Sequence, residues 1–209
     1  MVIKQLKLGP MDNFSYILWN SGEGEAAVID PAWEPEKIAA ALREESLSPT
    51  LLLLTHAHPD HINAADYFLS RNKTLRITLH KEDSFLLEGS AWPLNFPEDG
   101  EELKLGSSSI KILHTPGHTP GSVSYLAGGA VFSGDTLFVG ACGRADLPGS
   151  DPKALRRSLL RLAGLPGETV LYPGHAYNGD VSTIAVQKEY NVYMKLAARG
   201  EAEFLRSAV

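Results

Sequence analysis

Cysteine is almost absent from this sequence, because Cys142 is its only one. An intrachain disulfide is therefore excluded, which agrees with a reducing compartment. Long apolar runs are absent too, since no segment of the sequence approaches the roughly 20 residues that cross a bilayer as a helix. Residues 1–7 alternate apolar and basic side chains and lack the pattern of a signal peptide. We therefore expect a soluble, cytoplasmic protein that does not bind a membrane.

Clusters of Lys and Arg are also missing, and the net charge is −6. An acidic chain of this kind lacks the electrostatic footprint of a protein that binds nucleic acid, so a small molecule is the more natural partner. The chain has 209 residues, of which 44% are hydrophobic. That length favours one large domain over residues 1–209, because two domains would each be small. The sequence leaves the oligomeric state open.

Strand and helix patterns alternate along the chain. Leu51 to Leu54 is continuously apolar, which predicts a strand that is covered on both faces. Other strands are expected at 2–8, 14–19, 25–30, 75–79, 110–114, 123–126, 131–133 and 170–172, and helices at 35–47, 63–71, 81–87, 152–162 and 181–198, with a loop over 89–100. This order indicates sheets with helices packed outside them, an α/β arrangement.

The seven residues after that apolar strand, Thr55-His56-Ala57-His58-Pro59-Asp60-His61, contain three of the seven histidines of the chain. Imidazole and carboxylate groups are ligands of zinc and similar ions. His56 and His58 project to the same side of an extended backbone, whereas the adjacent Asp60 and His61 point in different directions. The spacing therefore predicts two metal positions. The alternative is a polar surface loop, which explains the concentration of histidines poorly.

Three further residues follow glycines at the ends of predicted strands, namely His118, Asp135 and His175. Glycine allows backbone conformations that other residues avoid, which helps several loops to converge on one ion. Each of the three could alternatively be an ordinary turn residue.

Together these residues resemble the ligand pattern of the metallo-β-lactamase superfamily. The resemblance implies an α/β fold, the four-layer αββα sandwich, with metal ions at one edge between the sheets. It also implies two groups of metal ligands and one bridging carboxylate, which are His56, His58 and His118, then Asp60, His61 and His175, and Asp135 between them. A carboxylate is able to bridge because it has two oxygens, whereas an imidazole offers one free nitrogen.

This ligand set predicts two divalent metal ions, with zinc as the first expectation and iron or manganese as alternatives. Two ions about 3.5 to 4 Å apart acidify a bridging water, so that a hydroxide nucleophile exists near neutral pH. No Ser or Cys nucleophile is then needed. Asp60 and Asp135 are the carboxylates that we expect to act in catalysis.

Two segments narrow the range of possible substrates. Gly140-Ala141-Cys142-Gly143-Arg144 is similar to the Cys-Gly-Arg segment of glyoxalase II, the hydroxyacylglutathione hydrolases, and His175-Ala176-Tyr177 resembles the His-x-Tyr of that family. There these loops line the glutathione pocket, which makes Arg144 and Tyr177 candidates for binding the substrate. The alternatives are that Arg144 pairs with a nearby Asp146 or Asp151, and that Tyr177 is an aromatic residue at the edge of the core.

The segment Arg144-Ala145-Asp146-Leu147-Pro148-Gly149-Ser150-Asp151 resembles the short, single-domain glyoxalase-II-like hydrolases. A metal-dependent hydrolase of a small thioester, such as a hydroxyacylglutathione, is therefore expected. The alternative is a persulfide dioxygenase, a class that shares this pattern but holds one iron with the equivalents of His56, His118 and Asp135. A metal-binding protein without catalysis is disfavoured because every ligand position is present. His80, His114 and Cys142 are expected to be structural.

Overall fold

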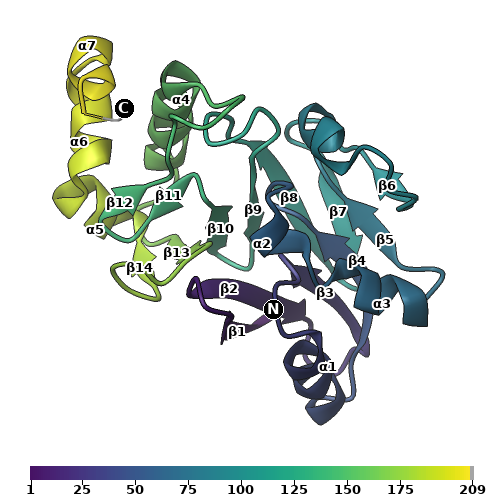
Figure 1. Ribbon diagram of the computed structural model, residues 1–209. Coiled ribbons are helices and arrows are strands. Elements are labelled where there is room, and N and C mark those ends of the chain that lie inside the picture. Colours follow the sequence, from purple (N-terminus) through teal and green to yellow (C-terminus); the bar gives the residue numbers. More distant parts are fainter. Residues whose placement is uncertain (208–209) are drawn as a thin grey trace.

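The computed structural model describes residues 1–207 and contains two six-stranded sheets (Figure 1). In the first sheet β1 to β3 form an antiparallel meander, and β3 to β6 run parallel. The strands follow one another in chain order as β1 (Val2–Leu8), β2 (Asn13–Trp19), β3 (Glu25–Ile29), β4 (Ser48–Leu53), β5 (Arg76–Thr78) and β6 (Leu94–Asn95).

The second sheet has the order β14-β13-β10-β9-β8-β7. Only β10 and β13 pair in parallel within it, and the other neighbours are antiparallel. Its strands are β7 (Glu102–Leu105), β8 (Ser108–His114), β9 (Val123–Ala127), β10 (Ala130–Gly134), β13 (Val170–Pro173) and β14 (Ser182–Thr183). A separate hairpin of β11 (Leu137–Phe138) and β12 (Ala141–Cys142) follows β10.

Helices cover the outer face of each sheet (Figure 1). Beside the first sheet lie α1 (Pro35–Glu44), α2 (Pro59–Ile62), α3 (Ala65–Arg71) and the 3-10 helix η1 (Lys81–Leu87). Beside the second lie α4 (Pro152–Ala163), α5 (Ile184–Tyr190), α6 (Val192–Arg199) and α7 (Glu201–Leu205). Within residues 1–207, none of these helices has the length and apolar character that a bilayer crossing requires.

Three apolar cores separate the four layers. Side chains alternate along a strand, so each inner strand contributes to two cores at once. Along β2, Tyr16 and Leu18 face the other sheet while Ile17 faces the helices. Along β4, Leu53 faces the other sheet and Leu52 the helices. The predicted αββα sandwich is confirmed, and so is the prediction that β4 is covered on both faces.

The predicted elements differ from the observed ones at the C-terminal helix and at short strands. Residues 182–183 of the expected helix form β14, and the strands β7, β11 and β12 were not predicted. The helix expected over 181–198 is divided at Asn191, whose Oδ1 accepts hydrogen bonds from the backbone N–H of Tyr193 and Met194 and so begins α6. Its Nδ2 donates to the carbonyl of Ala141, which ties the break to β12. The loop expected over 89–100 contains β6, a two-residue strand at the sheet edge.

The two sheets are also joined by a buried hydrogen bond. The hydroxyl of Tyr16 in β2 donates to the carbonyl oxygen of Pro173 in β13, immediately before the loop that carries His175. We expect Tyr16→Phe to lower the free energy of unfolding by about 1 to 3 kcal/mol, because the carbonyl is left buried without this donor. Urea unfolding measures the change. Tyr190→Phe is the control, since Tyr190 is 69% exposed, and an equal effect of both substitutions contradicts the prediction.

Candidate metal centre

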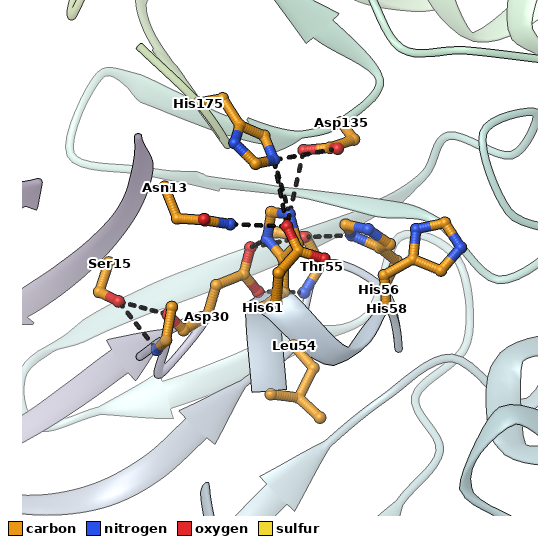
Figure 2. Close-up of polar contacts among 12 residues, drawn as sticks. Asn13, Ser15, Asp30, Leu54, Thr55, His56, His58, His61, Asp135 and His175 are labelled. Atoms are coloured by element: carbon orange, nitrogen blue, oxygen red, sulfur yellow. Dashed lines mark hydrogen bonds and ion pairs between the residues drawn. The ribbon is translucent and has the colours of Figure 1, made fainter. Parts of the chain in front are cut away.

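The seven candidate ligands converge at one edge between the two sheets. Five of them are labelled in Figure 2, namely His56, His58, His61, Asp135 and His175. Each of the seven lies just beyond the carboxyl end of a strand. The segment 56–61 follows β4, His118 follows β8, Asp135 follows β10, and His175 follows β13. The carboxyl ends of parallel strands meet at one edge of a sheet, where α/β proteins commonly bind ligands. The topology thus assembles residues that are far apart in the sequence.

A first group consists of His56, His58 and His118, whose ligand atoms all lie within 4.8 Å of one another. His58 Nδ1 and His118 Nε2 are 3.0 Å apart. Within residues 1–207, the buried Nε2 of His56 has no hydrogen-bond partner. A buried polar atom without a partner costs free energy, so a ligand at this point would satisfy it.

A second group consists of Asp60, His61 and His175, again with ligand atoms within 4.8 Å of one another. The Nε2 atoms of the two histidines are 3.1 Å apart, and Asp60 Oδ2 lies 3.5 Å from each. Two groups of three ligand atoms provide for two metal ions, one at each group.

Asp135 lies between the groups. Its Oδ1 is 3.3 Å from His61 Nε2, and its Oδ2 is 3.4 Å from His175 Nε2 and 3.6 Å from His118 Nε2. The carboxylate therefore reaches both groups, which is the position that a bridging ligand needs. Asp135 Oδ1 is buried and has no hydrogen-bond partner within the described residues. The donor set thus fits a pair of divalent ions on the geometry alone.

Carboxylates dominate the electrostatics here. Burial by itself lowers the pKa of His61, but Asp135 and Asp30 outweigh burial and raise the pKa well above its ordinary value. Burial likewise raises the pKa of Asp135, and the adjacent His61 and His175 more than reverse that effect. In contrast, burial lowers the pKa of His56 well below its ordinary value, so this imidazole stays neutral. A neutral imidazole beside ionised carboxylates is the form that binds a divalent cation.

A model of the metallo-beta-lactamase superfamily matches residues 8–175, which include all seven candidate ligands. The chain belongs to this superfamily.

Individual proteins are similar over nearly the whole chain. Hydroxyacylglutathione hydrolase GloC of Haemophilus influenzae is 33% identical, over 85% of this chain and 91% of that protein. The crystal structure of ETHE1 from Myxococcus xanthus has a TM-score of 0.88 at 32% identity, covering 99% of this chain and 89% of that one. The di-iron-bound form of TTHA1623 has a TM-score of 0.81 at 37% identity, covering 91% and 99%.

In this superfamily member, hydrogen bonds fix the orientation of four candidate histidines. His175 Nδ1 donates to the carbonyl of Met11, and His118 Nδ1 to that of Arg144. His61 Nδ1 donates to Asp30, and His56 Nδ1 lies 3.1 Å from the hydroxyl of Thr55. Each bond leaves the Nε2 lone pair free for an ion, and such outer partners also make the ligand nitrogen more basic.

Sequence reasoning missed two buried carboxylates that hold the centre together. Asp30, in the left-handed region at φ +47°, accepts hydrogen bonds from the backbone and hydroxyl of Thr55 as well as from His61. Asp83 in η1 accepts from the backbone N–H of Ala57, the hydroxyl of Thr119 and the backbone N–H of Gly121. Asp83 therefore connects the loop of His56 and His58 to the loop of His118. The only signal in the sequence was the position of Asp30 at the end of a strand.

The glycines before the candidate ligands serve different purposes. Gly134 has φ +49°, which other residues adopt at a cost, and a Cβ there would lie 2.4 Å from Thr55 Oγ1. A Cβ on Gly174 would lie 2.3 Å from Asp135 Oδ1, although this glycine does not need a positive φ. The expectation of special backbone conformations thus holds for Gly134 and also for Gly117, at φ +137°, whereas Gly174 is required by close packing.

The two candidate substrate-binding residues lie on loops beside the centre. The ring of Tyr177 stacks on His175 with 4.6 Å between centroids and an angle of 9°, and it is 52% exposed. Burial raises the pKa of its hydroxyl to about 12. The guanidinium of Arg144 donates to both carboxylate oxygens of Asp146, at 2.9 and 2.8 Å. This pairing with Asp146 is the structural alternative that the sequence offered for Arg144. The Arg144 side chain lies in the exposed pair, and its backbone carbonyl contacts the centre at His118.

The remaining polar candidates lie apart from the centre. The rings of His80 and His114 stack at 3.9 Å with an angle of 14°, and His114 Nε2 donates to the carbonyl of Pro120. The ligand atoms of His80, Glu82 and His114 also lie within 4.8 Å of one another, but Glu82 is exposed and His114 Nε2 is already engaged by the Pro120 carbonyl. Burial raises the pKa of Cys142 to about 12, so the thiol stays protonated at neutral pH. The structural roles expected for His80, His114 and Cys142 stay a prediction.

The position of Asp135 leads to a prediction about metal content. We expect Asp135→Ala to weaken metal binding at both groups, because one carboxylate contacts both of them. His58→Ala should weaken the first group preferentially, because His58 belongs to that group alone. Elemental analysis after equilibration with buffered zinc gives the number of ions per chain. Loss of both ions in His58→Ala would contradict the division, and so would loss of only one ion in Asp135→Ala.

Proposed function

We propose that this protein is a dinuclear metal hydrolase that cleaves a small thioester, such as a hydroxyacylglutathione. The observation that carries the proposal is the pair of three-residue groups with the carboxylate of Asp135 between them. His56, His58 and His118 would hold one ion, Asp60, His61 and His175 the other, and Asp135 both. Two divalent ions, when bound, lower the pKa of water and polarise a carbonyl oxygen. Zinc is the first expectation, with iron or manganese as alternatives.

The side chains of the centre then have separate tasks. The outer hydrogen bonds hold the histidines in one orientation, so little rearrangement is needed during the reaction. Asp60 and Asp135 are the catalytic carboxylates. Asp135 is almost buried, whereas the side chain of Asp60 is 18% exposed and borders the solvent.

A thioester suits this site because its leaving group, a thiolate, departs without a strong proton donor. A thiol has a pKa of about 8.5, so the departing sulfur needs little protonation near neutral pH. Accordingly, the proposal requires no dedicated general acid. The similarity to GloC supports the hydroxyacylglutathione class, since that protein is covered over 91% of its length. The acidic composition of the chain also favours a small molecule over nucleic acid.

Tyr177 and Arg144 are proposed to bind the thiol-bearing half of the substrate. We expect Tyr177→Ala and Arg144→Ala to raise KM more than they lower kcat, because they remove binding remote from the reacting carbonyl. Steady-state kinetics with the thioester measures both constants. Arg157→Ala is the matched control, since Arg157 is another exposed arginine near a carboxylate, Asp151. A pure loss of kcat in the Tyr177 and Arg144 variants would contradict a binding role.

A persulfide dioxygenase is the second candidate. His56, His118 and Asp135 form a face of two histidines and one carboxylate, the set that non-haem iron oxygenases use. The similarity of the fold to that of ETHE1 supports a test of this alternative.

One experiment separates the two candidates. A lactoylglutathione-type thioester and glutathione persulfide are assayed side by side, and the metal content is measured on the same preparation. We expect thioester turnover by protein that holds two divalent ions. Oxygen uptake with persulfide, together with one iron per chain and no thioester turnover, would replace the hydrolase with the dioxygenase.

A further inference from the structure

We propose that Asn13 and Trp33 act as a positioning pair that sets the affinity of the second metal position by orienting Asp60. This inference rests on the proposed metal centre and adds two residues to it. Neither residue belongs to a group of candidate ligands. The pair would determine whether the centre holds one ion or two at a given concentration of free metal.

The hydrogen bonds run in one direction from Trp33 to Asp60. Trp33 Nε1 lies 2.7 Å from Asn13 Oδ1, and Asn13 Nδ2 lies 2.9 Å from Asp60 Oδ2. An indole N–H only donates, so the amide oxygen of Asn13 must face Trp33. The amide NH₂ must then face Asp60. Figure 2 shows Asn13 beside the centre. Trp33 thereby fixes the orientation of an amide that could otherwise rotate by half a turn.

The surrounding backbone holds this pair rigidly. Asn13 is fully buried, and the preceding Asp12 has φ +56°. Trp33 itself has φ +53°, a conformation that a bulky residue rarely adopts and that neighbouring contacts must maintain. Its indole packs over Gly9, where a Cβ would lie 2.2 Å from the ring. Asn13 and Trp33 are thus joined by a partly buried hydrogen bond and flanked by strained backbone, a combination that clusters at functional sites.

The same N-terminal segment also orients a second member of that group. The carbonyl of Met11 accepts from His175 Nδ1, and the carbonyl of Asp12 accepts from the backbone N–H of Ala176. Residues 11–13 therefore support two of the three second-group residues, Asp60 and His175. The first group is supported elsewhere, by Thr55 for His56 and by Arg144 for His118. A change at Asn13 or Trp33 should thus act on one position and spare the other.

The test compares metal titrations of metal-free protein. Trp33→Phe keeps an aromatic ring over Gly9 but removes the N–H that orients Asn13. We expect calorimetric titration with zinc to show two binding steps in the wild-type protein. In the variant the second step should weaken by about 10- to 100-fold, the usual effect of losing an outer hydrogen-bond partner, while the first step is unchanged.

Trp92→Phe is the matched control, because Trp92 Nε1 donates to the carboxylate of Asp66 at the same distance of 2.7 Å, and neither residue belongs to the centre. It should titrate like the wild type. Asn13→Ala is the second variant, and it keeps Trp33 in place. If a lowered melting temperature shows that Trp33→Phe does not fold properly, Asn13→Ala still tests the inference. It should weaken the second step at least as much.

Three results would overturn the inference: unchanged titrations, equal weakening of both steps, or a wild-type protein that takes up a single ion. Two binding steps with the expected selective loss, but without thioester turnover, would support the inference while the proposed hydrolase fails. The readout is metal affinity, so the two conclusions are separable.

Discussion

The buried carboxylate of Asp30 is the interaction on which the centre depends most. It accepts three hydrogen bonds, two from Thr55 and one from His61, and so joins the end of β3 to the chain that leaves β4. A buried anion is tolerable only when several donors surround it. Those donors lie within or beside the segment that carries most of the candidate ligands. Satisfying Asp30 therefore fixes the path of that segment and the orientation of His61 together.

The rest of the centre is built on the same physical rule. Asp83 is a second buried anion whose donors lie in two different loops, so its hydrogen bonds draw the loop of His58 toward that of His118. The fold brings these loops near one another because both sheets present carboxyl strand ends at a common edge. Apolar cores supply most of the stability, while buried carboxylates decide the arrangement of the polar residues. The second group of candidate ligands additionally contacts the turn before β2, so the two groups differ in their support.

Much of the architecture is readable from local patterns. The unbroken apolar run at β4 indicates a strand buried on both faces, because residues on its two sides must each meet an apolar layer. Histidines and carboxylates concentrated after that strand indicate a metal site, since no surface role requires so many of them. Short edge strands such as β6 escape prediction because two residues carry no periodicity. The break at Asn191 escapes it because the capping side chain lies within an otherwise helical pattern.

The sequence by itself determined which chemical groups this protein brings to its centre, because the spacing of His56, His58 and His118 can be recognised along the chain without knowledge of the fold. Only the tertiary structure decided which groups orient them. Asn13 meets Asp60 across 47 positions, and Asp83 meets Gly121 across 38. Such partners are single polar residues without a local pattern, and each becomes recognisable only when a buried donor or acceptor must be satisfied. Burial, which exists only in the folded chain, is the physical reason for that difference.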